Sequence, residues 1–254
     1  MCATCGCGGA GVRVTEIGHG HGHEHGHEHG HGHGHSHEPA VRTVDLEADL
    51  LAANDGLAAR NRAALAAQGI VAVNLMSSPG SGKTTLLERT VRELAGERPV
   101  AVLEGDQETL IDAERISATG VRAVQINTGA GCHLDADMVA SGVRELAPER
   151  GSLLFVENVG NLVCPALFDL GERARVVIMS VTEGADKPLK YPHMFRTADL
   201  MLVNKIDLLP YVDFDVARCV EYARRARPGV PVLELSATTG AGLDGWYDWL
   251  RRLS

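Results

Sequence analysis

The sequence has few aromatic residues and no long apolar segment. Aromatic side chains make up 4% of the 254 residues and hydrophobic residues 44%, so the core should consist mainly of Val, Leu, Ile and Ala. No apolar run approaches the roughly 20 residues that a membrane-spanning helix needs. We therefore expect one sizeable globular domain with an appendage, and no membrane insertion.

Positive charge is also scarce, with 24 Lys and Arg against 33 Asp and Glu and a formal net charge of -9. Nucleic acids and anionic membranes need clustered basic side chains, so neither is an expected partner.

Cys, Gly and Ala follow Met1, where a secretory signal would have a basic and then an apolar stretch, and we expect a cytoplasmic protein. In a reducing compartment the six cysteines are expected to be ligands, nucleophiles or core residues before disulfides.

Composition divides the chain into three expected segments. Residues 1–44 are rich in Gly and His and poor in large apolar side chains, which predicts a metal-binding tail that is disordered without metal. Residues 45–69 are expected to form a helix, because leucines from Leu46 to Leu65 recur at helical spacing. Residues 70–254 alternate short apolar runs with polar helical stretches and are expected to form the main domain.

Seven short apolar runs in the main domain predict β-strands. They are Val71–Met76, Val100–Glu104, Ala123–Ile126, Leu153–Glu157, Val176–Val181, Leu200–Val203 and Val232–Leu235. Helices are expected to start near Thr84, Thr109, Asp135, Asp215 and Asp244. Continuous apolar strands joined by helices indicate an α/β fold with a mostly parallel sheet covered on both faces. Ligands of such sheets bind beyond the carboxyl ends of the strands.

The segment Ser77–Thr85 follows the first expected strand and leads into a helix. It matches the P-loop pattern G-x-x-x-x-G-K-[ST] except for Ser77 at the first Gly, and this predicts a P-loop NTPase domain rather than a plain Gly-rich turn. Lys83 would reach the β- and γ-phosphates, and the Thr84 hydroxyl would bind Mg²⁺. The residues expected to hold the nucleotide here are Gly80, Ser81, Gly82, Lys83, Thr84 and Thr85.

The segment Asn204-Lys205-Ile206-Asp207 follows the sixth expected strand and matches the N-K-x-D element of GTPases. Asp207 would accept hydrogen bonds from the N1 and N2 groups of guanine, which adenine cannot offer. Lys205 would lie along the base and Asn204 would brace the loop. After the last strand, Ser236-Ala237 is similar to the final guanine-contacting loop, with the Ala237 N–H directed at guanine O6. The predicted nucleotide is GTP or GDP.

The segment Glu157-Asn158-Val159-Gly160 stands where GTPases carry a D-x-x-G switch, with Glu157 in place of Asp. The Gly160 N–H would sense the γ-phosphate. Asn161 follows where many GTPases have a water-orienting Gln, so slow intrinsic hydrolysis is expected. Asp106 is a second candidate near Mg²⁺ or the attacking water, with a helix N-cap as its alternative. The residues expected to take part in hydrolysis are Lys83, Asp106, Glu157 and Gly160.

Cysteine and histidine clusters predict transition-metal binding. Cys2, Cys5 and Cys7 put three soft ligands within reach of one ion, and the residues between them offer no core to pack in. A flexible His-rich tail would bind Ni²⁺, Zn²⁺ or Cu²⁺ weakly but with high capacity. Its ten imidazoles are His19, His21, His23, His25, His27, His29, His31, His33, His35 and His37.

A third cluster is formed by Cys132 and His133, which follow a Gly-rich turn, and Cys164, which lies beyond the switch. Two thiolates and an imidazole suit Ni²⁺ or Zn²⁺. Each residue taken alone could equally be structural. Cys219 has no other candidate metal ligand near it in the sequence and is predicted to pack in a helix.

Together and in this order, the motifs resemble the hydrogenase maturation GTPase family HypB. The resemblance implies nickel delivery to [NiFe]-hydrogenase, a GTP-dependent homodimer, and partnership with the nickel-binding protein HypA and the hydrogenase large subunit. It also implies that metal is bound by two clusters of residues, Cys2, Cys5 and Cys7 in one and Cys132, His133 and Cys164 in the other. It also associates the segment Lys187–Tyr191, which begins Lys-Pro-Leu-Lys, with dimerisation.

Two other functions compete with this one. The urease accessory GTPase family has a similar fold but lacks the N-terminal cysteines and carries a Cys-Pro-His motif, whereas Ala166 follows Cys164-Pro165 here. A nickel storage protein with a regulatory GTPase domain would instead retain its metal in every nucleotide state. A pure signalling GTPase would leave the clustered ligands unexplained.

Overall fold

The computed structural model describes residues 40–106, 111–129 and 131–253. The chain divides into two units, residues 1–50 and residues 51–254, and the second unit holds the whole sheet. Helix α1 (Ala40–Ala67) crosses this division. It begins earlier than the predicted residue 45, directly after Pro39 in the sequence, and Pro is common at helix starts.

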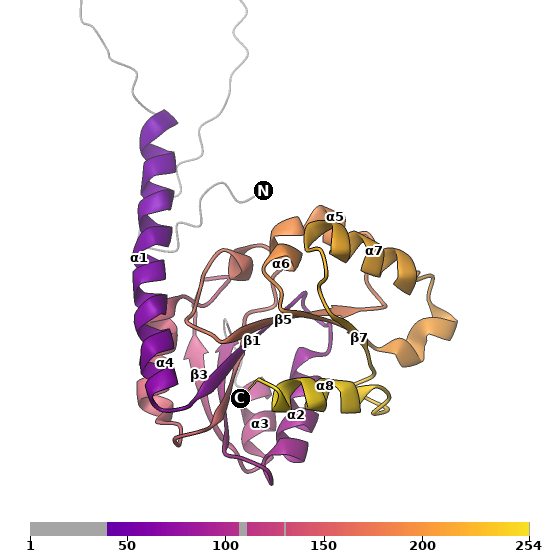
Figure 1. The fold of residues 1–254 in the computed structure, drawn as a ribbon, viewed down its shortest axis with the longest axis horizontal. Helices are drawn as coiled ribbons and strands as arrows, with labels where there is room; N and C mark the ends of the chain where they lie inside the picture. Colours follow the sequence, from indigo (N-terminus) through magenta and orange to yellow (C-terminus); the bar gives the residue numbers. More distant parts are fainter. Residues whose placement is uncertain (1–39, 107–110, 130, 254) are drawn as a thin grey trace, which may run out of the picture. The chain divides into compact units, whose positions relative to one another are not determined.

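The second unit is built on one seven-stranded parallel sheet in the order β3-β2-β4-β1-β5-β6-β7 (Figure 1). The strands are β1 (Val71–Ser77), β2 (Val100–Asp106), β3 (Arg122–Asn127), β4 (Leu153–Glu157), β5 (Ala174–Ser180), β6 (Leu200–Asn204) and β7 (Val232–Glu234). All seven strand predictions are confirmed. Strand β1 lies at the centre, between β4 and β5, so the loops that follow these strands meet at one edge of the sheet.

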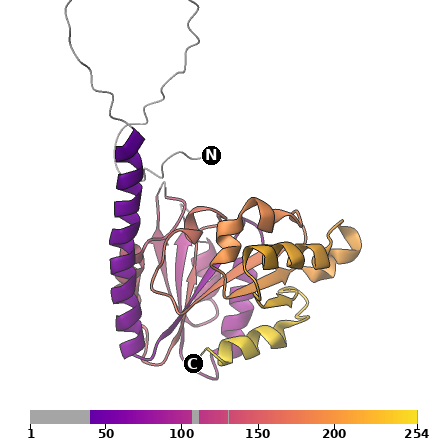
Figure 2. The same ribbon diagram turned by 45° about the horizontal axis from the view of Figure 1, so that its top comes forward.

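Helices connect the strands and cover both faces of the sheet (Figure 2). They are α2 (Lys83–Leu94), α3 (Ile111–Ser117), α4 (Ala136–Leu146), α5 (Lys187–Lys190), α6 (Pro192–Arg196), α7 (Val216–Ala226) and α8 (Leu243–Arg251), with two 3-10 turns, η1 (Cys164–Ala166) and η2 (Ile206–Tyr211). Asp135 and Asp215, predicted to mark helix starts, cap α4 and α7 through their side chains. Helices α5 and α6 were not predicted.

The core lies on the two faces of the sheet. Alternate residues of β1 point to opposite faces, so Leu75 packs with α2, α3 and α8, whereas Met76 packs with α6 and α7. Leu65 of α1 joins the cluster of α4. The core is mainly aliphatic, as the composition predicts, with Phe155 and Trp246 among its fully buried large side chains. Among the described helices, none combines the length and apolar character needed to cross a membrane.

From Leu51 onward, α1 is fastened to the loop before α4 and to the loop before β5. The Asn54 side chain donates to the Asp169 carbonyl (2.8 Å) and accepts from the Ala136 amide (2.9 Å). Asn61 donates to the Ala136 and Leu170 carbonyls (2.7 and 3.1 Å). These bonds hold the first residue of α4, Ala136, in place, and the predicted metal ligands Cys132 and His133 lie four and three residues before it.

Candidate functional site

The P-loop joins β1 to α2 and borders a pocket of about 590 Å³, within the range of small-molecule sites. Gly80 and Gly82 have positive φ angles of 72° and 91°, which favour glycine. A Cβ atom at Gly82 would lie 2.6 Å from the Asn204 amide nitrogen, so no side chain fits there. The pocket is lined by residues 77–85, Glu104, Gly105, Asp106, Asp112, Arg115, residues 157–160 and Lys205.

Lys83, Thr84 and Glu157 meet inside this pocket. One Glu157 carboxylate oxygen accepts from the Thr84 hydroxyl (2.7 Å) and lies 3.1 Å from the Lys83 ammonium. The other Glu157 oxygen is buried and has no hydrogen-bond partner among the described residues. A hydroxyl and a carboxylate with an unused oxygen suit Mg²⁺, and Asp106 lines the same pocket. The structure thus places the two residues predicted for Mg²⁺, Thr84 and Asp106, in one pocket, and adds Glu157 beside Thr84.

Glu104 is a pocket residue that the sequence analysis missed. It stands in register with Glu157 on the neighbouring strand, and both carboxyls are almost fully buried. Burial, and then the nearby charge of Glu157, raise the pKa of Glu104 to about 8. The one available signal was its position two residues before Asp106, but strand pairing is needed to see the two carboxyls side by side.

We measure stability as the free energy of unfolding of the protein free of nucleotide and Mg²⁺. The change in this free energy caused by Glu104→Gln, relative to the parent, is expected to be more favourable at pH 8 than at pH 5. The folded-state pKa of about 8 lies above the usual 4.5, so unfolding releases a proton between these values and stability falls as pH rises, by at most about 1.4 kcal/mol per pH unit. Gln does not titrate. Urea unfolding at both pH values measures the difference, with Glu114→Gln on the exposed surface of α3 as control. An equal effect at both pH values would contradict the buried protonated carboxyl.

Asn204 braces the predicted guanine loop, as expected. Its amide donates to the Ser81 carbonyl (2.9 Å), and its oxygen accepts from the Lys205 and Ala237 amides (2.8 and 3.0 Å). Lys205 has a φ of 64° and donates from its ammonium to the Gly80 carbonyl (2.7 Å). One side chain therefore ties the P-loop to both segments that are predicted to bind the base.

Asp207 lies in η2 with one carboxylate oxygen buried and without a hydrogen-bond partner among the described residues. That oxygen is an available acceptor for guanine. The Ala237 N–H donates to the Asn204 side-chain oxygen, and its contact with guanine O6 stays a prediction. Ser236 is buried, and its hydroxyl accepts from the Thr239 amide (3.0 Å). Asp207, Ser236 and Ala237 lie beyond the pocket lining given above.

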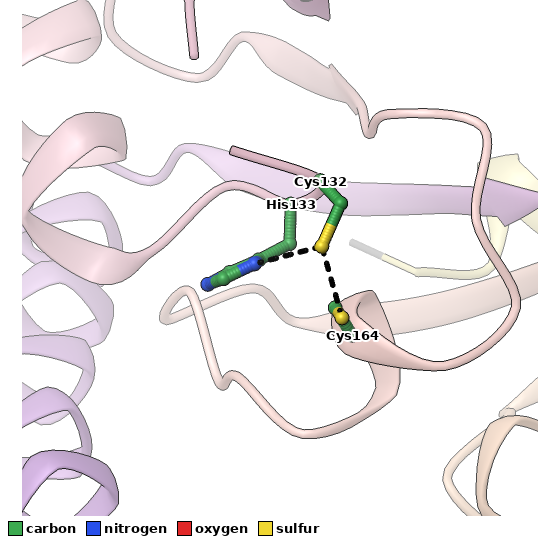
Figure 3. Close-up of side chains that lie close together, drawn as sticks. All are labelled: Cys132, His133 and Cys164. Atoms are coloured by element: carbon green, nitrogen blue, oxygen red, sulfur yellow. Dashed lines mark hydrogen bonds between the residues drawn. The ribbon is translucent and has the colours of Figure 1, made fainter. Parts of the chain in front are cut away.

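The predicted Cys132, His133 and Cys164 cluster comes together beside the switch (Figure 3). The two sulfur atoms lie 3.0 Å apart, Cys132 Sγ lies 3.8 Å from His133 Nδ1, and one ligand atom of each residue falls within 4.8 Å of the others. Cys132 and His133 follow β3, whereas Cys164 opens η1. Two soft sulfurs and one nitrogen form a donor set that suits Ni²⁺ or Zn²⁺.

His133 is held ready to act as a ligand. Its ring is buried and stacks on Phe168 with centroids 4.0 Å apart. Burial lowers the pKa of His133, which favours the neutral imidazole that binds metals. Cys219, by contrast, packs against Met179 in the core, and burial raises the pKa of its thiol to about 12. The prediction that Cys219 is a packing residue is confirmed.

Several predicted site residues lie outside the described part of the chain. These are Cys2, Cys5 and Cys7 and the ten histidines between His19 and His37. The alternative role of Asp106 as a helix N-cap also involves residues outside the described part, because residues 107–110 lie between Asp106 and α3.

The Lys-Pro-Leu-Lys segment reaches the P-loop directly. The Lys187 ammonium donates to the Ser78 hydroxyl (3.2 Å), which donates to the Glu183 carboxylate (2.6 Å). Lys187 and Glu183 also pair at 3.2 Å. The sequence analysis did not identify Ser78 and Glu183 as linking residues, because they lie 105 positions apart in the sequence.

The parallel sheet, the P-loop and the Asn204–Asp207 loop define a P-loop nucleotide-binding domain of the GTPase type. The family model described as "CobW/HypB/UreG, nucleotide-binding domain" matches residues 71–234. The hydrogenase maturation factor HypB of Azotobacter chroococcum is 59% identical over 211 residues, covering 83% of this chain and 69% of that protein. The chain belongs to the CobW/HypB/UreG family of P-loop GTPases, and within it to the hydrogenase maturation factors HypB.

Solved structures agree with this assignment. HypB from Archaeoglobus fulgidus superimposes with a TM-score of 0.75 at 43% identity, covering 80% of this chain and all of that one (100%). HypB from Helicobacter pylori in complex with nickel gives a TM-score of 0.73 at 37% identity, covering 78% of this chain and 94% of that one. The predicted family and fold class are therefore confirmed.

Proposed function

We propose that this chain hydrolyses GTP and uses the nucleotide state to control the binding and delivery of Ni²⁺ for assembly of the [NiFe]-hydrogenase active site. The observation that carries the proposal is the adjacency of two sites. Gly160 packs against the P-loop, where an added Cβ would lie 3.1 Å from Pro79 Cα. Cys164 follows four residues later, no more than about 14 Å away even if the chain were extended.

The pocket residues account for GTP hydrolysis. Lys83 leaves Glu157 to bind the β- and γ-phosphates, while the Gly160 N–H contacts the γ-phosphate. Thr84 and Glu157, with Asp106 nearby, would hold Mg²⁺, which supplies positive charge against the phosphates when bound. The Asn161 side chain bonds to the Cys132 carbonyl and the Val163 amide, so it is not poised to orient water. Slow intrinsic hydrolysis follows.

Nickel is the cargo in this proposal. Cys132, His133 and Cys164 hold Ni²⁺, or Zn²⁺ in competition with it, at the edge of the GTPase domain. Cys2, Cys5 and Cys7 form a tighter site in the tail of residues 1–44, and the histidines of that tail supply weaker capacity. Thiolates bind such ions more strongly than scattered imidazoles, so the tail has two classes of site.

Family membership supports a set of proposed partners. The chain is proposed to form a GTP-dependent homodimer, to receive nickel with HypA, and to serve the hydrogenase large subunit in the cytoplasm. The contact of Lys187 with Ser78 supports a link between the Lys187–Tyr191 segment and the nucleotide. Loss or gain of phosphate contacts at the P-loop would reach this segment through that contact.

A nickel-transfer assay tests the function. The nickel-loaded protein is mixed with HypA and a hydrogenase large subunit, or with apo-urease, in the presence of GTP or GDP. Nickel appearing in the large subunit with GTP, and much less with GDP, is the expected result. Preferential transfer to urease would support the urease accessory function. Retention of nickel in both nucleotide states would support storage.

A further inference from the structure

Two asparagines flank Gly160, and each bonds to the turn that carries Cys132 and His133. Asn158 is fully buried, and its side-chain oxygen accepts from the Leu134 amide (3.2 Å). Asn161 donates from its side chain to the Cys132 carbonyl (3.3 Å). The two bonds therefore hold the turn on either side of His133.

The two asparagines are fixed to different degrees. The Asn158 backbone amide donates to the Leu75 carbonyl (3.0 Å), and its side-chain amide donates to Asn74 (3.3 Å), both on the central strand β1. Asn161 lies beyond Gly160 and is bonded to the adjacent Val163 amide (2.9 Å) instead of the sheet. Asn158 is thus the fixed end of this connection, and Asn161 is the end that a displacement of Gly160 would carry along.

We propose that Asn161 is a positioning residue that transmits the state of the γ-phosphate to the metal ligands, with Asn158 as its anchor. The proposal rests on the proposed function, in which nucleotide state controls nickel binding. When Gly160 moves onto the γ-phosphate, Asn161 moves the Cys132 carbonyl while Asn158 holds the Leu134 amide. The turn rotates about His133, and Cys132 shifts relative to His133.

This connection adds to the effect of chain continuity. Cys164 follows Gly160 in the chain and is displaced with it in any case. Cys132 lies 32 residues from Cys164 in the sequence, and the Asn161 side chain bonds its backbone directly to the switch residues 157–161. Through Asn161 both thiolates respond to the same event. Since a ligand shift of an ångström or so spoils metal geometry, both movements alter nickel affinity.

The substitution Asn161→Asp separates this role from a structural one. Aspartate has the same shape and keeps the acceptor for the Val163 amide, but it cannot donate to the Cys132 carbonyl. Asn127→Asp is the matched control, because Asn127 is exposed on the same β3 connection and accepts from the Gly129 amide, an interaction that aspartate keeps. Asn161→Ala removes the donor without adding charge and serves as the second variant.

The experiment uses the full chain with Cys2, Cys5 and Cys7 changed to Ala, so that thiolate-to-nickel charge-transfer absorption reports on Cys132 and Cys164. Ni²⁺ is titrated with Mg²⁺-GDP or a non-hydrolysable GTP analogue bound, and nucleotide affinity confirms folding. A severalfold ratio between the two nickel affinities is expected in this parent and in Asn127→Asp. The ratio should fall below about twofold in Asn161→Asp and Asn161→Ala.

The outcomes are distinguishable. A ratio retained in both Asn161 variants overturns the role of Asn161 and leaves the proposed function standing. A parent with no nucleotide-dependent ratio overturns both. Loss of the ratio in Asn161→Asp alone, with Asn161→Ala unchanged, also overturns the proposal, because the introduced charge and not the lost donor would be its cause.

Discussion

Replacing Cys164 with Ala is expected to lower the nickel affinity of the Cys132, His133 and Cys164 site by more than about 100-fold. Changes in the residues that merely support metal ligands already cost 10- to 100-fold, and this change removes a thiolate ligand itself. The measurement is a Ni²⁺ titration of the full chain lacking Cys2, Cys5 and Cys7, followed by charge-transfer absorption.

The matched control for this prediction is Cys219→Ala. Cys219 is fully buried against Met179 and far from the ligand turn in sequence, so the nickel affinity should not change even if stability falls. Unchanged nickel affinity in Cys164→Ala would mean that the three residues are a packing cluster. The tail histidines bind Ni²⁺ without thiolate absorption and are the same in the parent and the variants, so their competition for the metal does not change the comparison.

Asp207→Asn is expected to weaken GTP binding by roughly 1.5–3 kcal/mol, or about 10- to 150-fold, and to improve binding of xanthosine triphosphate. The buried Asp207 oxygen has no hydrogen-bond partner among the described residues and is available to the guanine amino group. Xanthine carries an oxygen at that position, to which the Asn amide can donate. Competition against a fluorescent guanine nucleotide gives both affinities.

Asp213→Asn provides the control for Asp207, because Asp213 is an exposed carboxylate shortly after η2. It should change neither affinity. If Asp207→Asn also left both affinities unchanged, the base would be recognised elsewhere. If both nucleotides lost affinity equally, Asp207 would support the loop without reading the base.

Much of the nucleotide site could be predicted because local sequence determines it. The P-loop needs glycines where φ is positive, and Gly80 and Gly82 have such angles. The strands are apolar on both faces because helices cover both, so each was visible as a continuous apolar run. Even the ligand cluster was predictable in outline, since the carboxyl ends of parallel strands share one edge of the sheet.

The remaining features depend on pairing and side-chain geometry that sequence spacing does not contain. The meeting of Glu104 and Glu157 follows from the register of β2 with β4. The bond from the Ala237 N–H to the Asn204 side chain joins residues 33 positions apart, and no local sequence pattern predicts it. The bond from Asn161 to Cys132 is likewise long-range. The domain limits at residues 44 and 69 stay predictions, although α1 is continuous from Ala40 to Ala67.

The most direct test of nucleotide-controlled nickel binding is the affinity for a non-hydrolysable GTP analogue, measured with and without Ni²⁺ on the full chain lacking Cys2, Cys5 and Cys7. Linkage requires the metal to change nucleotide affinity by the same factor as the nucleotide changes metal affinity. We predict a severalfold change that disappears in Cys164→Ala. Equal affinities with and without Ni²⁺, while charge-transfer absorption shows Cys164 bound to the metal, would contradict the account.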